Sequence, residues 1–320
     1  MQEVLVVGGA GFIGSHICEA LLNKGYQVIC LDNFVTGDKK NIEHLLDNPH
    51  FQFIEQDITE KIPNSKFQIS NIKFIFHLAS PASPNKKSPR SYINHPVETL
   101  LVNSLGTYNL LELAKKTNAQ FLYASSSEIY GDPAVSPQDE SYFGNVNPNG
   151  VRSVYDEGKR FGEAMTMAYV RTHNVDARIV RIFNTYGPNM QKDDGRVISN
   201  FITQAIANDA ITMYGDGKQT RSFCFVSDMI DGLQQAMFAK NTKGQVFNLG
   251  NQDERTIIDL ATLIKKMTQS VSDIVFEPLP QDDPRNRRPD STKAKMTFGW
   301  EPKVALHEGL EKTIQYFRSI

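Results

Sequence analysis

The segment formed by residues 123–133 (YASSSEIYGDP) contains the first residues whose types suggest chemistry. One carboxylate, Glu128, follows three consecutive serines and precedes a tyrosine. A strand that ends in small hydroxyl residues commonly presents them to a ligand, and a lone glutamate there would be an unusual way to fill a core. We therefore expect Ser126 and Glu128 to belong to a ligand site.

A glycine-rich turn, GGAGFIG, follows the first apolar run and opens a helical pattern. Gly8, Gly11 and Gly14 permit a tight turn and let a pyrophosphate approach the backbone at the helix N-terminus. Asp32 ends the next strand, at the offset where an acid accepts the adenosine ribose hydroxyls and repels a 2′-phosphate. This context favours NAD over NADP. It also favours a nucleotide site over the alternative, a glycine turn with a surface aspartate that binds no nucleotide.

Further residues are expected around the same cofactor. Asp57 ends another strand, where it would either reach the adenine or be solvated. The other expected cofactor-binding residues are Phe12, Ile13, Asn33, Ile58, Leu78, Ala79, Tyr155 and Lys159.

Tyr155 and Lys159 form a YxxxK pair, which on a helix places both side chains on one face, one turn apart. A nearby ammonium and a positive nicotinamide ring would lower the tyrosine pKa from about 10 and make it a general base for a sugar or alcohol hydroxyl. Ser126 is the natural partner to share that oxygen. Tyr214 and Lys218 have the same spacing, but the Gly-Asp-Gly between them predicts a turn.

Apolar strands alternate with helical patterns over the first 183 residues, which predicts an α/β fold with a doubly wound parallel sheet. Helices are expected at residues 12–23, 97–116 and 155–173. Glycine, proline and basic residues become frequent after Phe183 and indicate a smaller, discontinuous lobe. We assign residues 1–184 and 222–260 to an NAD-binding Rossmann domain, and residues 185–221 and 261–320 to a nucleotide-sugar-binding lobe.

Composition excludes several classes of function. The 320 residues carry a net charge of -2, which gives no general reason to bind nucleic acid or an anionic membrane. The chain shows no signal peptide and no stretch long enough to span a bilayer, so a cytoplasmic location is expected. Cys18, Cys30 and Cys224 form no CxxC pair; buried thiols and no metal site are expected.

The chain resembles the extended short-chain dehydrogenases/reductases that act on nucleotide sugars, and most closely the UDP-glucuronate decarboxylase family. GGAGFIG and YxxxK mark only the superfamily, whereas HLASPASP, SEIYGDP, QTRSF and RRPD are narrower signs. The other segments that carry the resemblance are DNFVTG, YDEGKR, RIFNTYGP, DGRVISNF, YGDGK and QDDPRN.

The resemblance implies roles for individual residues. Ser126, Tyr155 and Lys159 would form the hydride-transfer set, and Glu128 would be a catalytic acid or base. A UDP-sugar would be the substrate. Residues implied to bind it are Asn184, Arg196, Val197, Tyr214, Arg221 and Arg287. Relatives usually pair through two helices per subunit, so a homodimer with a four-helix contact is expected through residues 97–116 and 155–173.

The implied reaction gives Glu128 a purpose. Oxidation of C4 of a UDP-hexuronic acid makes a ketone β to the carboxylate, so carbon dioxide can leave while an enolate forms. Ser126 and Tyr155 would donate hydrogen bonds to the enolate oxygen, and Glu128, directly or through a water, would manage the proton at C5. Hydride then returns to C4.

Three other functions remain open at this point. A 4,6-dehydratase commonly has an Asp-Glu pair at the strand end, but here the first position is Ser127. A 4-epimerase needs only the hydroxyl, tyrosine and lysine, so Glu128 would be superfluous. A catalytically silent nucleotide-binding protein would not need its Ser126, Tyr155 and Lys159 intact.

Two segments bear on the identity of the substrate. Arg221 would either clamp the UDP diphosphate or contact the substrate carboxylate, and the neighbouring Ser222 removes an aspartate common in the family that would oppose such a carboxylate. The loop PASPNKKSPRSYINHP is a few residues longer than expected for a decarboxylase. Its Lys86, Lys87 and Arg90 would either cap the substrate or, as we favour, be solvated.

Overall fold

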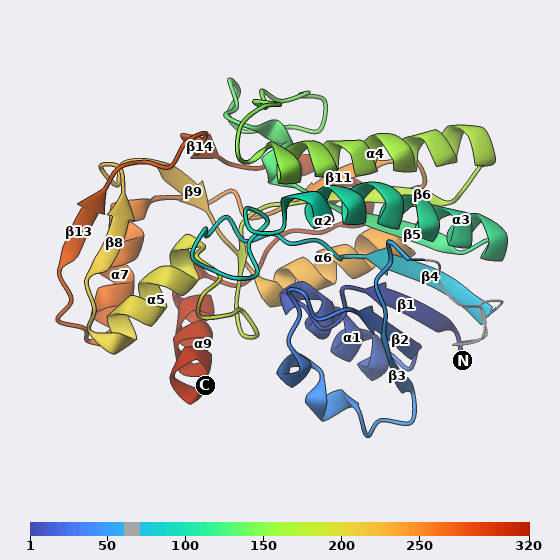
Figure 1. The fold of residues 1–320 in the computed structure, drawn as a ribbon, viewed down its shortest axis with the longest axis horizontal. Helices are drawn as coiled ribbons and strands as arrows, with labels where there is room; N and C mark the ends of the chain where they lie inside the picture. The colour runs from blue at the N-terminus through green and yellow to red at the C-terminus, as the bar shows by residue number, and fades with distance from the viewer. Residues whose placement is uncertain (61–70) are drawn as a thin grey trace.

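A seven-stranded parallel sheet forms the centre of the computed structural model, which describes residues 1–60 and 71–320 (Figure 1). The strand order is β11-β6-β5-β4-β1-β2-β3, and the order reverses between β1 and β4. At such a reversal the carboxyl ends of the strands border a crevice that binds ligands. The strands are β1 (Glu3–Val7), β2 (Gln27–Asp32), β3 (Phe51–Glu55), β4 (Ile72–His77), β5 (Gln120–Ser126), β6 (Ala177–Ile182) and β11 (Val246–Leu249). The predicted doubly wound fold is confirmed.

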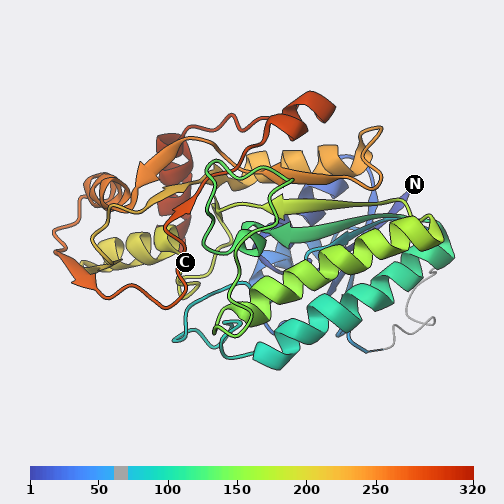
Figure 2. The same cartoon turned by 90° about the horizontal axis from the view of Figure 1, so that it is seen from above.

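Helices cover both faces of this sheet (Figure 2). One face carries α1 (Phe12–Asn23) and α6 (Val226–Phe238), whereas α3 (Thr107–Thr117) and α4 (Ser153–His173) lie side by side on the other. Strand residues such as Val4 and Leu5 alternate between the two cores and are fully buried. Because both faces are covered, the strands consist of nearly continuous apolar runs.

The helix predicted over residues 97–116 is present without a break, but it contains a π-helical turn that was not predicted. The structure has α2 (Pro96–Leu101), a π-helical turn η4 (Val102–Gly106) and then α3. Within the π turn the buried Asn103 amide donates to the Ser80 hydroxyl at 2.9 Å, and the Tyr123 hydroxyl donates to Asn103 at 2.9 Å. Such turns within α-helices are frequent at functional sites. Helical periodicity alone does not reveal them.

The second lobe is built from small sheets and three helices, on the left of Figure 1. Strand β8 (Ile211–Tyr214) pairs with β13 (Ile274–Glu277), and β9 (Thr220–Ser222) lies between β12 (Glu254–Thr256) and β14 (Asn286–Arg287). The helices are α5 (Val197–Ala207), α7 (Ile257–Thr268) and α9 (Leu306–Ser319). The β9–β14 register places Arg287 directly beside Arg221.

Six shorter elements complete the described chain. They are η1 (Lys39–Asn41), η2 (Glu43–Leu45), η5 (Ser127–Tyr130), β7 (Thr185–Tyr186), β10 (Cys224–Phe225) and α8 (Thr292–Phe298). The three cysteines are free and buried, as predicted. Within residues 1–60 and 71–320, no helix is long and apolar enough to cross a bilayer, and no cluster of three or more His, Cys, Asp or Glu side chains is suited to hold a metal ion.

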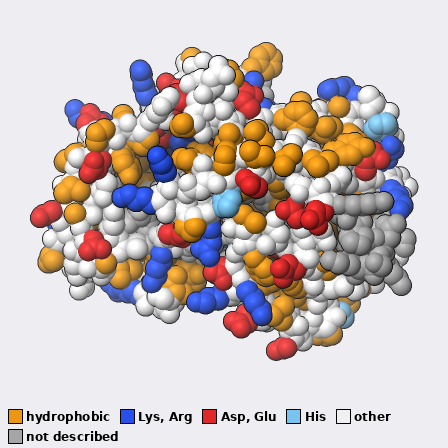
Figure 3. All heavy atoms as spheres, in the orientation of Figure 1, with side chains coloured by type: hydrophobic (Ala, Val, Ile, Leu, Met, Phe, Trp, Pro, Cys, Tyr) orange, Lys and Arg blue, Asp and Glu red, His pale blue; other side chains and the backbone are white. Residues whose placement is uncertain are grey.

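One surface is rich in apolar side chains. Figure 3 shows hydrophobic groups gathered over α2 and α4. The exposed apolar residues of α2, η4, α3 and α4 are Val97, Leu100, Leu101, Leu105, Tyr108 and Phe161. A contiguous apolar surface of this kind is typical of a protein interface.

Candidate active site

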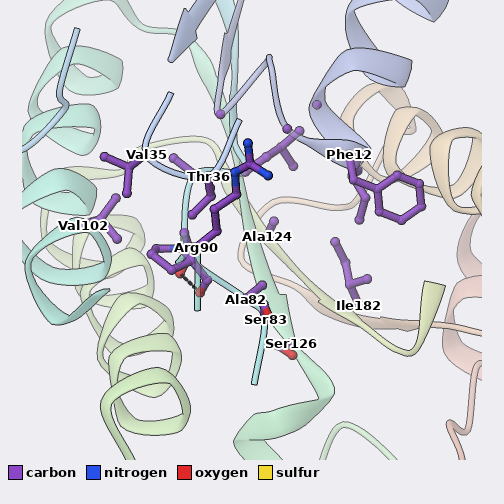
Figure 4. A pocket seen from close by; sticks show the side chains of 18 of the residues that line it. Phe12, Val35, Thr36, Ala82, Ser83, Arg90, Val102, Ala124, Ser126 and Ile182 are labelled. Carbon is purple, nitrogen blue, oxygen red and sulfur yellow. Dashed lines mark hydrogen bonds between the residues drawn. The ribbon is translucent and has the colours of Figure 1, made fainter. Parts of the chain in front are cut away.

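A cavity of about 260 Å³ lies at the carboxyl ends of the central strands (Figure 4). Every residue predicted to bind the cofactor lines it, namely Gly8, Gly11, Phe12, Ile13, Gly14, Asp32, Asn33, Asp57, Ile58, Leu78, Ala79, Tyr155 and Lys159. Ser126 and Glu128 line it as well. The structure therefore brings the strand-end hydroxyl and carboxylate of the sequence analysis to the same cavity as the glycine-rich turn.

The glycine-rich turn has the geometry of an anion site. Gly8 has a positive φ of 79°, and a Cβ on Gly14 would lie only 2.0 Å from the Gly8 carbonyl oxygen. No side chain caps α1, whose first backbone N–H groups have no partner within the helix. These N–H groups and the helix dipole fit a diphosphate.

Asp32 and Asp57 are held in place by nearby amides. The Asp32 carboxylate accepts hydrogen bonds from the Ala10 N–H at 3.0 Å and the Phe34 N–H at 2.8 Å; burial raises its pKa, and these bonds oppose the rise. The Asn33 side-chain amide donates to Asp57 at 2.9 Å. A carboxylate at the end of β2 fits ribose hydroxyls and disfavours a 2′-phosphate.

Tyr155, Lys159 and Ser126 meet where α4 packs against β5. The Lys159 ammonium donates to the Ala124 carbonyl at 2.8 Å and lies 5.7 Å from the centre of the Tyr155 ring. Burial lowers the pKa of Lys159 to about 7. Burial also raises the pKa of Tyr155 to about 12, and a hydrogen bond with Ser126 only partly offsets this. The expected lowering of the Tyr155 pKa is therefore not produced by the protein's own groups.

Glu128 lies between two arginines. The Arg152 Nη2 is 2.5 Å from one carboxylate oxygen, and the Arg287 Nη1 is 3.0 Å from the other. Burial raises the pKa of Glu128, but the charges of Arg287 and Arg152 outweigh burial and hold the pKa at about 2. Arg287 also donates to the Ser127 hydroxyl at 3.0 Å. Glu128 is therefore ionised at neutral pH.

Sequence reasoning missed three residues of this site. Arg152 is one, and the Tyr92 ring is another, stacked on Tyr155 with centroids 5.2 Å apart. The third is Asp156, which is buried with one carboxyl oxygen that accepts no hydrogen bond from the described residues; burial and the charge of Glu128 raise its pKa to about 8. Asp156 adjoins Tyr155 on α4, and Arg152 directly precedes that helix, so their positions were the available signal. No local pattern marks Tyr92.

The residues expected to bind substrate are divided between two places. Asn184 and Arg196 line the cavity. Arg221 and Arg287 lie together on β9 and β14, where Arg221 pairs with Asp283 at 3.1 Å and its charge also lowers the Glu128 pKa.

Two of the expected substrate residues lie elsewhere. Val197 and Tyr214 are absent from the described cavity lining, as are Arg221 and Arg287. Tyr214 is exposed at the end of β8, and the chain turns at Gly215 and Gly217, as predicted for this Tyr–Lys spacing.

The longer loop at residues 81–96 is only partly as expected. Lys86 and Lys87 are exposed to solvent. Arg90 is not, because its side chain is only 32% exposed and lines the cavity beside Val35 and Thr36. The expectation that all three basic side chains are solvated is therefore wrong for Arg90.

Proteins similar in sequence to this chain include enzymes that act on nucleotide sugars. The family model described as GDP-mannose 4,6 dehydratase matches residues 5–313. UDP-glucuronic acid decarboxylase 1 of Danio rerio is 49% identical over 316 residues, covering 99% of this chain and 72% of that protein. UDP-glucuronic acid decarboxylase 4 of Arabidopsis thaliana is 50% identical over 316 residues, covering 99% and 68%.

Solved structures of similar fold include two epimerases. The UDP-glucose 4-epimerase of Thermotoga maritima, solved with UDP-glucose, has a TM-score of 0.90 at 30% identity, covering 99% of both chains. The UDP-glucuronic acid 4-epimerase of Bacillus cereus, in complex with UDP-glucuronic acid and NAD, has a TM-score of 0.87 at 29% identity, covering 99% of both chains. The chain belongs to the epimerase/dehydratase family of extended short-chain dehydrogenases/reductases, in the group of the UDP-glucuronic acid decarboxylases.

Proposed function

We propose that this chain binds NAD and decarboxylates UDP-glucuronate to UDP-xylose. The observation that carries this proposal is the position of Glu128, ionised between Arg152 and Arg287, at the cavity that also contains Ser126 and Tyr155. A hydride-transfer set beside an arginine-rich anion site is what an oxidation coupled to the loss of a carboxylate needs. The identity to decarboxylases over nearly the whole chain supports the same reaction.

The cavity fits a dinucleotide. The unpaired N–H groups at the start of α1 would hold its diphosphate, Asp32 its adenosine ribose, and the wall around Tyr155 and Lys159 its nicotinamide. When bound, NAD would supply the two-electron acceptor that takes hydride from C4 and returns it.

Ser126 and Tyr155 would hold the C4 oxygen of the sugar. Tyr155 accepts the hydroxyl proton during oxidation, and the Lys159 ammonium beside its ring stabilises the phenolate. After C4 becomes a ketone, the β-carboxylate leaves as carbon dioxide. Hydrogen bonds from Ser126 and Tyr155 then stabilise the enolate oxygen.

Glu128 would act on the proton that C5 must gain. A carboxylate with a pKa of about 2 holds no proton at neutral pH, so it does not serve as the acid itself. It accepts a hydrogen bond and can therefore orient the water that donates to C5. The sequence left open whether Glu128 acts on C5 directly or through a water, and the route through a water is favoured. Arg287 and Arg221 would hold the UDP or the sugar acid from β14 and β9.

Two other reactions are the nearest alternatives. A dehydratase would need an acid at Ser127, but this hydroxyl accepts a hydrogen bond from Arg287. A 4-epimerase would use Ser126, Tyr155 and Lys159 in the same way, and similar solved structures include such enzymes. It would release UDP-galacturonate and retain the carboxylate.

The two lobes and the apolar helical surface support a division of labour within the chain and an assembly of two chains. Residues 1–184 and 222–260 would bind NAD, whereas residues 185–221 and 261–320 would bind the nucleotide sugar, together with β12, which pairs with β9 of the second lobe. Two chains would pair through α2, α3 and α4, because these helices expose the apolar side chains seen in Figure 3. We place the dimer in the cytoplasm.

Incubation of the purified chain with NAD and UDP-glucuronate tests the function. UDP-xylose, identified by mass and NMR, is the expected product. UDP-galacturonate would instead establish an epimerase. Tight binding of NAD with no turnover of UDP-sugars would establish a catalytically silent protein.

A further inference from the structure

The long loop at residues 81–96 is fastened to a wall of the cofactor cavity. The Ser83 hydroxyl donates to the Asp194 carbonyl, the Asn85 amide donates to the Asp193 carbonyl at 3.1 Å, and the Ser88 hydroxyl donates to the Asp193 carboxylate at 3.1 Å. Asp194 itself lines the cavity. The loop is therefore placed over the cavity by specific bonds.

Arg90 projects from this loop into the cavity, beside Thr36 (Figure 4). Its guanidinium lies 3.6 Å from the Asp193 carboxylate and 3.9 Å from the Asp38 carboxylate. The Asp38 N–H donates to the carbonyl of Ala10, within the glycine-rich turn, at 3.0 Å. The carboxylates of Asp193 and Asp38 thus position the guanidinium, and Asp38 is itself bonded to the glycine-rich turn.

The guanidinium donors of Arg90 are available to a ligand. Three cationic side chains line the cavity in the described part of the chain, and two are engaged: Lys159 by the Ala124 carbonyl at 2.8 Å, and Arg196 by Asp194 at 2.8 Å. Arg90 makes no side-chain hydrogen bond to any described residue, and both of its ion pairs are longer than a hydrogen bond. A partly buried guanidinium of this kind is suited to a phosphate, which it can bind through two parallel bonds.

We propose that Arg90 binds the diphosphate of the bound dinucleotide, together with the backbone N–H groups at the start of α1. This inference rests on the proposed binding of NAD. The neighbours of Arg90 favour the dinucleotide over the UDP-sugar, because Val35, Thr36 and Asp38 follow the ribose-binding Asp32, whereas Arg221 and Arg287 lie on the second lobe. A second diphosphate contact would retain the cofactor through the cycle, in which the hydride taken from a sugar must return to that same sugar.

Binding titrations on Arg90→Gln test this role without requiring turnover. The control is Lys87→Gln, which removes the same charge from an exposed position of the same loop. Because a charged hydrogen bond contributes about 1.5–3 kcal/mol, Arg90→Gln should bind NAD and ADP-ribose roughly 10- to 100-fold more weakly. Adenosine, which lacks the diphosphate, and UDP should bind as to the wild type. Arg90→Lys, which retains the charge without the planar fork, should bind NAD with an affinity between those of the wild type and Arg90→Gln.

Several outcomes would overturn the proposal. They are an unchanged affinity of Arg90→Gln for NAD and ADP-ribose, an equal loss in Lys87→Gln, and a loss confined to UDP, which would assign Arg90 to the substrate diphosphate. Thermal unfolding of each variant checks that the fold is intact. If the wild type does not decarboxylate UDP-glucuronate but Arg90→Gln still weakens NAD binding as expected, only the proposed reaction is contradicted. Failure of the Arg90 proposal can therefore be distinguished from failure of the proposed function.

Discussion

Arg287 and Glu128 are 159 residues apart in the chain, yet their side chains form an ion pair at 3.0 Å. Arg287 is on β14 of the second lobe, and Glu128 follows β5 of the central sheet. The pair therefore joins the strand-end carboxylate to the lobe proposed to bind the sugar. Arg152 contacts the same carboxylate from the start of α4, so three elements meet at one charge.

The first prediction concerns the Arg152–Glu128 pair. Arg152→Met should lower the free energy of unfolding by about 3 kcal/mol at neutral pH, because it leaves a buried carboxylate with one partner fewer. Glu128→Gln in the same chain should restore part of this loss, and denaturant unfolding of the four proteins in the cycle measures it. Arg171→Met, at an exposed position of the same helix, is the control and should change stability little.

The pH dependence of this pair has a defined sign. The pKa of Glu128 lies at about 2, below the unfolded value of about 4.5, so its stabilising contribution is present above the unfolded pKa and is lost as pH falls through the folded one. Removing Arg152 should move this loss to higher pH. If Arg152→Met lost stability over the same acid pH range as the wild type, the result would contradict the ion pair.

Tyr155→Phe should abolish turnover and leave cofactor binding intact. The variant keeps the ring stacked on Tyr92 but loses the hydroxyl proposed to accept the proton of the sugar's C4 hydroxyl. The rate should fall by at least about 10², the low end of what a positioned general base contributes. NAD titration and a turnover assay measure the two effects, with Tyr26→Phe as a control outside the cavity. Turnover of Tyr155→Phe at the rate of the wild type would remove Tyr155 from the mechanism.

Lys159→Met should stabilise the fold while it destroys activity. Burial lowers the pKa of Lys159 from 10.5 to about 7, so between these values the unfolded chain binds more protons and the stability of the wild type rises with pH. The variant should therefore be more stable than the wild type below pH 7, by on the order of 1 kcal/mol, and its advantage should shrink toward pH 10. Denaturant unfolding at several pH values measures this, and an advantage that grows with pH would contradict the buried ammonium.

The proposed dimer depends on the apolar surface of α2, η4 and α4. Replacing Leu101 and Leu105 by Glu places charges in that surface and should yield monomers in analytical ultracentrifugation. The matched change Met296→Glu, at an exposed apolar position on α8, should leave the dimer intact. A wild-type chain that sediments as a monomer at all concentrations would rule out the contact.

Much of the cofactor cavity could be predicted from sequence because its signals are local. The glycine-rich turn, Asp32 at the end of the next strand and the Tyr155–Lys159 spacing each lie within one supersecondary unit, and the doubly wound sheet follows from apolar runs alternating with helices. The π turn at Val102–Gly106 depends instead on the tertiary contacts of Asn103, so periodicity predicted the helix but not the turn within it.

The electrostatics of the site could not be predicted in the same way. The Glu128 pKa is set by Arg287 from a distant strand, and the Tyr155 pKa by its burial in the folded protein. The main cause in each case is the tertiary structure and not a neighbour in the chain. Arg90 shows the same limit, because a basic residue in a long loop is usually solvated, and only the bonds from its loop to Asp193 and Asp194 place it in the cavity.

The central claim is that the chain removes C6 of UDP-glucuronate and that Glu128 assists the protonation of C5. Release of labelled carbon dioxide from UDP-glucuronate carrying ¹³C at C6, with the reaction run in D₂O, tests both parts. We predict one carbon dioxide per UDP-xylose and one deuterium at C5 for the wild type. For Glu128→Gln, which keeps the size but not the charge of the side chain, the chemical step should be about 10²–10⁴-fold slower with little change in NAD or UDP affinity. Unchanged carbon dioxide release by the variant would contradict the role of Glu128, and no release by the wild type with NAD bound would contradict the proposed function.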